Sequence, residues 1–457
     1  MIKRVLSLGI IAAAAAAVAL LPIPNIAIGQ NVEYSKLDVA PQALQLICPG
    51  AAMNSGGASG TAVGQFDRLG ASTISKQVSA GANLTSVSAG GATVLSVTGI
   101  KEQGSAVLNA GELQNAASAR LNGLLGASCQ APSAQHWLLG GDTSTGRETL
   151  LLLSNPASVP TTVNLEVYAE GGRVQASGLS GIAVSAGSTQ VVPLSSLIPE
   201  TRAFAVHVES RGAAVGAWLQ QRTVRGLLYA GADFVSPLTE ISKSLSIPGI
   251  LVRGSKDAAA LIAINSDYSD LLPALRVFNP SNKTANFTAQ IFGANAKTFG
   301  TVIHDSVPAG SVKEFVITGL ADGDYAASIT SDAQIAASVR LPRSNKTAKP
   351  NTDFTWLQSG QPLTGTQSIT VPAAGISKLS LINPNGKSIS VSVGGTAITL
   401  ASAEVRVIPV AAGQSVSIVS NDAPVVGNLV IDVSGAVTNF GLVDYRNSGS
   451  SVAVKVR

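Results

Sequence analysis

Charged residues are scarce in this chain, where Asp, Glu, Lys and Arg make up 12% of 457 residues. That is about half the usual share for a soluble domain. The formal net charge is +4, from 30 Lys and Arg against 26 Asp and Glu, and no dense basic run occurs. Because nucleic-acid binding needs Lys and Arg clustered on one face, we expect no nucleic-acid partner.

Residues that carry chemistry are also few, with three His and two Cys in the whole chain. There is no Gly-x-Ser-x-Gly elbow and no His-Glu-x-x-His helix. His207 alternates with apolar neighbours, which predicts a solvent-facing or edge histidine. A triad assembled from distant residues stays open. We therefore predict no enzyme, no catalytic residue and no cofactor, and a hydrolase with an unrecognised site is the minor alternative.

Two acidic pairs and one loop are candidate ligand sites in the sequence. The pairs are Asp267 with Asp270 and Asp322 with Asp324. Each offers only two carboxylates where calcium needs more oxygens, so turns are favoured and no metal site is predicted. The segment 141–148 resembles a phosphate loop but ends in Arg147-Glu148 and enters a strand. It is interpreted as a hairpin loop.

The chain is instead rich in repetition. An apolar strand-like segment runs into an Asn-Pro pair three times, at Asn155, Asn279 and Asn383. Pro cannot donate to a sheet ladder and disfavours helix before it, so each pair ends a strand. Self-similarity on this scale indicates duplicated modules.

Alternating strands with turns every eight to twelve residues predict an all-β chain of tandem antiparallel Ig-like sandwiches. A β-propeller is the alternative, but the repeats exceed the length of a blade. The expected divisions are module 1 (residues 30–135, containing the cysteines), module 2 (136–240), module 3 (241–363) and a shorter module 4 (364–457). A helix is expected only near 110–125, where Leu113, Leu121 and Leu124 recur at helical spacing.

Residues 1–29 predict an export signal. Lys3 and Arg4 precede an apolar stretch at 5–21, and small residues before Gln30 suit cleavage. A cleaved signal peptide and a retained membrane anchor both remain open, because the stretch lies between the lengths typical of each. Either way, the rest of the chain is expected outside the membrane, touching it only through this segment.

Cys48 and Cys129 are the two cysteines. In an exported chain two cysteines most simply form one disulfide, and buried thiols are the alternative. The three tryptophans, Trp137, Trp218 and Trp356, are expected to pack in cores or junctions. As exposed rings they would be candidate sugar contacts.

Several phrases together resemble an uncharacterised family of exported actinobacterial proteins, a domain of unknown function. They are residues 46–50 around Cys48, residues 128–132 around Cys129, Trp137 with Gly140-Gly141, and the Asn-Pro repeats. The resemblance implies an exported or membrane-anchored envelope protein and brings no catalytic residue.

The sequence thus favours a non-enzymatic extracytoplasmic cell-envelope protein with a scaffolding or binding role. An array of cell-wall or carbohydrate-binding modules is the alternative. An envelope protein or glycan is the expected partner, and the oligomeric state is left undetermined.

Overall fold

The computed structural model describes residues 34–38, 44–56, 62–78, 82–98, 108–294, 300–345, 351–444 and 451–455. The predicted signal or anchor at residues 1–29 lies outside them. In the described part of the chain, no helix is long and apolar enough to span a membrane. The chain divides into two compact units, residues 1–42 with 449–457 and residues 43–448. In the first unit, β1 (Tyr34–Asp38) pairs antiparallel with β33 (Ser451–Lys455).

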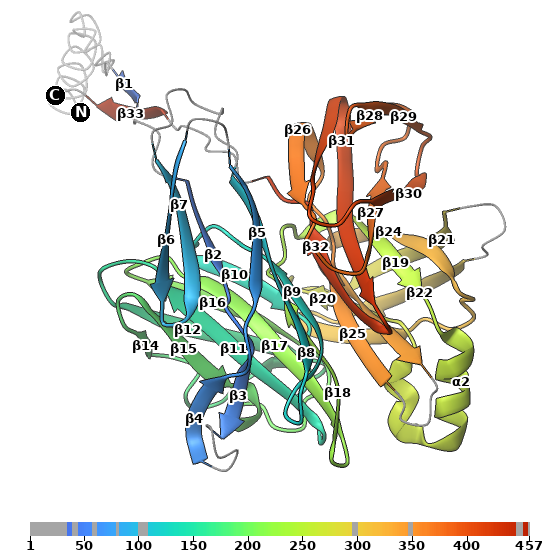
Figure 1. Cartoon of the computed structure of the whole chain (residues 1–457), viewed down its shortest axis with the longest axis horizontal. Coiled ribbons are helices and arrows are strands. Elements are labelled where there is room, and N and C mark those ends of the chain that lie inside the picture. Colours follow the sequence, from blue (N-terminus) through green and yellow to red (C-terminus); the bar gives the residue numbers. More distant parts are fainter. Residues whose placement is uncertain are drawn as a thin grey trace, which may run out of the picture. The chain divides into compact units, whose positions relative to one another are not determined.

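The second unit is all-β, as the sequence predicts (Figure 1). Module 1 contains two three-stranded sheets and a hairpin. Its strands are β2 (Leu44–Cys48), β3 (Met53–Gly56), β4 (Ala62–Arg68), β5 (Thr73–Val78), β6 (Asn83–Ala89), β7 (Ala92–Thr98), β8 (Leu108–Ala117) and β9 (Asn122–Ser128).

Modules 2, 3 and 4 share one topology of two antiparallel sheets over a common core. In module 2 the sheet orders are β10-β16-β12-β13, with β14 also on β12, and β15-β11-β17-β18. The elements are β10 (Gln135–Leu139), β11 (Arg147–Asn155), β12 (Thr161–Ala169), β13 (Gly172–Val174), β14 (Ile182–Val184), β15 (Ser188–Pro193), η1 (Leu194–Ser196), β16 (Phe204–Arg211), β17 (Gly216–Arg225) and β18 (Leu228–Val235).

Modules 3 and 4 repeat this order with one change: a single long strand serves both sheets. β24 and β31 each take the place of β16 and β17. Module 3 comprises β19 (Ser242–Val252), α2 (Ser255–Ile264), η2 (Ser266–Leu271), β20 (Ala274–Asn279), β21 (Ala285–Gly293), β22 (Thr301–Val307), β23 (Ser311–Val316), β24 (Gly323–Asn345) and β25 (Asn351–Gln358). Module 4 comprises β26 (Leu363–Thr370), β27 (Ile376–Ile382), β28 (Ile389–Val393), β29 (Thr396–Leu400), β30 (Val405–Val410), β31 (Ser415–Val433) and β32 (Ala436–Gly441).

The repeated Asn of each Asn-Pro pair is a buried hydrogen-bonding centre. Asn279 Nδ2 donates to the carbonyls of Lys283, Val307 and Pro308 at 2.7, 2.9 and 3.1 Å, and its Oδ1 accepts from the Ser281 N–H. Asn155 and Asn383 make the same set of bonds in their modules. The motif therefore ends a strand, as predicted, and its Asn also ties the following loop to a second turn.

The helix expected near residues 110–125 is wrong, because β8 and β9 form an antiparallel hairpin there. Gly126 pairs with Leu113 and Leu124 with Asn115. Helix propensity is a weak signal that tertiary pairing overrides, and the leucine spacing was coincidental. The described α-helix is α2, which together with η2 is inserted between β19 and β20 of module 3.

Candidate functional site at the module junctions

One strand from each module meets at a central junction. β9 packs against β18, β18 against β25, β25 against β32, and β32 back against β9. Each strand closes its module, since β18, β25 and β32 hold the same place in the repeated topology. The four modules therefore share one closed contact, which excludes an array in which each module touches only its sequence neighbours.

Asp353 on β25 lies at the middle of this junction and is 2% exposed. Its carboxylate accepts backbone N–H groups from the other three modules: Leu124 at 2.9 Å, Ala232 at 3.1 Å and Val437 at 3.0 Å. Gly231 allows this approach, because a Cβ there would lie 2.9 Å from the Asp353 Cα and its φ is +119°. One side chain thus holds all four modules together.

Asp233 on β18 makes a second set of bonds between modules. Its carboxylate accepts from the Gly126 N–H at 2.9 Å, from Thr438 Oγ1 at 3.1 Å and from Thr355 Oγ1. Asn439 on β32 donates to Thr355 Oγ1 at 2.7 Å. These bonds again reach every module.

The junction residues carry a sequence signal that our sequence analysis missed. Asp233-Phe234, Asp353-Phe354 and Asn439-Phe440 stand in the corresponding strands β18, β25 and β32. A search for acidic clusters along the chain passes over them, because single aspartates in apolar strands are unremarkable until the modules are aligned.

Burial dominates the electrostatics of this junction. Burial raises the pKa of Asp353 to about 7, although the backbone N–H groups of Leu124, Val437, Phe354 and Ala232 act in the opposite direction. The pKa of Asp233 is also raised well above its usual value, chiefly by burial and in part by the Asp353 charge. No cation contacts either carboxylate among the described residues.

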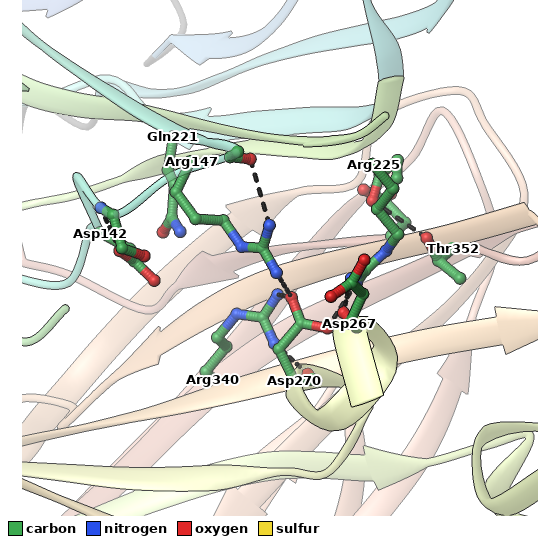
Figure 2. A network of polar contacts seen from close by, with 12 residues as sticks. Asp142, Arg147, Gln221, Arg225, Asp267, Asp270, Arg340 and Thr352 are labelled. Carbon is green, nitrogen blue, oxygen red and sulfur yellow. Dashed lines mark hydrogen bonds and ion pairs between the residues drawn. The ribbon is translucent and has the colours of Figure 1, made fainter. Parts of the chain in front are cut away.

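A second, lateral junction between modules 2 and 3 uses the opposite chemistry (Figure 2). Asp270 on η2 faces guanidinium groups from both modules. Arg147 lies 2.7 Å and Arg340 3.3 Å from its carboxylate, and Arg225 is the third ion-pair partner. Burial alone would raise the pKa of Asp270, but these three arginines hold it below the usual value.

A cavity of about 820 Å³ lies beside this cluster, lined by five arginines and four acidic residues. They are Arg147, Arg202, Arg225, Arg276, Arg340, Asp142, Asp267, Asp270 and Glu314. The segment 141–148 contributes to its wall, but it leads into β11 with no helix N-terminus to bind phosphate. Arg276 is only 2% exposed, binds Glu314 at 2.6 Å and lies 4.4 Å from the Trp356 ring centroid.

The three tryptophans pack in cores and junctions. Trp218 and Trp356 are 0% and 1% exposed. Trp137 is half-buried, stacked on His207 with centroids 4.2 Å apart, and it contacts Phe278 of module 3. An exposed, aligned sugar platform would need accessible rings, so this burial weakens that interpretation. His207 is neither solvent-facing nor at an edge, because β16 lies between β10 and β12.

The disulfide Cys48–Cys129 is present and joins the end of β2 to the residue after β9, as predicted. The acidic pairs weighed for calcium are engaged by the protein itself. Asp322 accepts the N–H groups of Gly254 and Ser255 at the start of α2, and Asp324 pairs with Arg253. No group of three or more His, Cys, Asp or Glu suited to a metal occurs in the described residues.

No curated protein matches the chain. Among solved structures, a chain titled "Biofilm associated protein - BSP domain" aligns at 8% identity with a TM-score of 0.11. The alignment covers 82% of this chain and 66% of that chain, just under two thirds of its length; a likeness this distant carries no argument. The model of a family of unknown function, DUF5719, matches residues 82–421, and the chain therefore belongs to that family.

Proposed function

We propose that this chain is a non-enzymatic, extracytoplasmic protein of the cell envelope that acts as a rigid scaffold. The observation that carries the proposal is the central junction, in which Asp353 accepts N–H groups from three other modules. A scaffold must hold its surfaces at fixed separations, and a shared buried contact does this better than linkers. The disulfide supports an oxidising, extracytoplasmic location.

Scaffolding is tested by measuring how fixed the module positions are. Spin labels are placed at Thr162 in module 2 and Ser390 in module 4, both exposed positions, in residues 30–457 with the native disulfide intact. Dipolar spectroscopy should give one narrow distance distribution. A broad distribution would show that the modules move independently and would contradict a rigid scaffold.

Binding of an acidic envelope component in the 820 Å³ cavity is the second candidate function. It is favoured by Arg202, the one arginine of the wall with no ion-pair partner among the described residues, because guanidinium groups bind carboxylates and phosphates in a two-pronged geometry. Isolated cell walls should retain residues 30–457 saturably in a sedimentation assay. Arg202→Ala should weaken retention, and retention no greater than that of an albumin control would exclude this function.

A further inference from the structure

A second cavity, of about 260 Å³, lies where the chain leaves the four strands of the central junction. Ser128, Gln358 and Gly441 are the last residues of β9, β25 and β32, and Ser236 follows the end of β18 by one residue. All four line the cavity. Every module therefore contributes residues to this cavity. Neither the Asn-Pro repeats nor the positions of the tryptophans predict it.

The lining carries hydroxyls and amides but no Asp, Glu, Lys or Arg. The polar members are Ser128, Gln130, Ser133, Gln135, His136, Ser236, Thr239, Gln358, Ser359, Asn428 and Asn439. The His136 Nε2–H donates to the Val215 carbonyl at 2.7 Å, and burial lowers the pKa of the ring, which favours its uncharged form. The cavity is uncharged, in contrast to the arginine-lined one.

Hydrogen-bonding capacity is left over in this lining. Ser359 is 0% and Asn428 4% exposed. The Ser359 Oγ, the Asn428 Oδ1 and the Gln358 Oε1 have no hydrogen-bond partner among the described residues. Buried polar atoms are normally paired, and these three oxygens lie just behind the cavity wall, out of reach of solvent, so they bond a ligand only when their side chains rotate toward the cavity.

The rest of the wall is apolar and aromatic. It includes Phe234, Pro237, Leu238, Trp356 and Leu442. A mixture of apolar faces with a few polar groups is typical of small-molecule sites. The space is several times the roughly 30 Å³ that one water takes up in the liquid, so it suits a small organic molecule.

We propose that this cavity binds a small uncharged carbohydrate, about one sugar ring. Hydroxyls and amides both donate and accept, which matches sugar hydroxyls, and apolar side chains such as Pro237 and Leu238 complete the wall. A charged ligand would be buried without a counter-ion, which is costly. The site is independent of the arginine-lined cavity, and either can fail while the other stands.

Two matched pairs of sugars test the charge selectivity on the unaltered protein. Glucose and glucuronate differ by a carboxylate, and N-acetylglucosamine and glucosamine by an ammonium group. Calorimetry and saturation-transfer NMR on residues 30–457 should show at least one neutral sugar binding, with its charged counterpart at least tenfold weaker. Equal binding of the charged sugars, or no binding by either neutral sugar, would overturn the proposal.

Three variants locate the site. Ser359→Ala removes a hydroxyl oxygen that has no hydrogen-bond partner among the described residues. Asn428→Leu removes an amide whose one described bond, to the Pro248 carbonyl, is 3.4 Å long. The double variant should weaken neutral-sugar binding at least tenfold. Gly441→Leu should also weaken it, and a Cβ at Gly441 meets no atom within 4 Å, so the variant should fold. Ser390→Ala, an exposed control, should bind normally. Unchanged binding in the folded Gly441→Leu and double variants would refute this location.

Discussion

The central and lateral junctions hold modules together through the same chemical group with opposite electrostatics. Asp353 is surrounded by backbone N–H groups, and burial raises its pKa to about 7. Asp270 is surrounded by three arginines, which hold its pKa below the usual value. Burial therefore decides the pKa of a carboxyl group when its hydrogen-bond donors are neutral, whereas full positive charges overcome burial. The two junctions should therefore respond in opposite directions to pH.

The largest effect is expected from Asp353→Ala. The change leaves the N–H groups of Leu124, Ala232 and Val437 without their acceptor. At roughly 1–3 kcal/mol for each unsatisfied buried group, the free energy of unfolding should fall by about 5 kcal/mol at pH 5. Denaturant unfolding followed by tryptophan fluorescence measures this, and a loss below about 1 kcal/mol would mean that the junction is not held by Asp353.

The pH dependence of Asp353 should be nearly as large. Its usual pKa is 3.8, and between this value and about 7 the folded state keeps a proton that the unfolded state has released. The contribution of Asp353 to the free energy of unfolding therefore falls by about 4 kcal/mol in total as pH rises from about 4 to 7. Above pH 7 this contribution no longer changes. In Asp353→Asn the fall should be clearly shallower, with Asp233 as the remaining source. An identical slope in both proteins would contradict this assignment.

A smaller loss, about 3 kcal/mol, is expected for Asp270→Ala at pH 7, because three guanidiniums lose their shared partner. The depressed pKa of Asp270 means that its contribution is present above its unfolded pKa and is lost as pH falls through the lower folded value. Asp267→Ala is the matched control, since Asp267 lies in the same segment, is exposed and has no ion-pair partner among the described residues. Equal losses from the two variants would rule out the arginine cluster as the cause.

The smallest effect is expected for a residue that lies outside both junctions. Asn383→Ala removes the side-chain bonds to Lys387, Leu400 and Ala401 within module 4. The cost of leaving these groups unpaired should be about 2 kcal/mol, with the pH profile unchanged. Urea titrations at pH 5 and pH 8 would show whether the loss is the same at both, and a pH-dependent loss would mean that module cores and junctions are not separable.

Much of the fold could be predicted from the sequence. The Asn-Pro repeats and the alternation of apolar and polar residues predicted all-β sandwiches in duplicated modules. The two cysteines predicted the disulfide. Two features could not be predicted locally. The hairpin over residues 108–128 depends on pairing between β8 and β9, and the contacts of Asp353 join residues 84 or more positions apart.

The candidate sites were less accessible to sequence reasoning. Asp270 was noticed as part of an acidic pair, but its three arginines come from β11, β17 and β24 and meet only in the fold. Trp356 was expected to pack in a core or junction, with a sugar contact as the alternative for an exposed ring, and the structure buries it between two cavities that it lines. Residue type indicated that these positions matter, and only the packing shows their surroundings.

Native-state hydrogen exchange at the amides of Leu124, Ala232 and Val437 tests whether the four modules share one junction, because these three amides from three modules share the Asp353 carboxylate as acceptor. A single shared junction predicts that all three exchange through the same opening, with equal free energies and equal dependence on denaturant. Three distinct opening free energies, such as an early release of Val437 with module 4 alone, would contradict a shared junction. The modules would then open independently of one another.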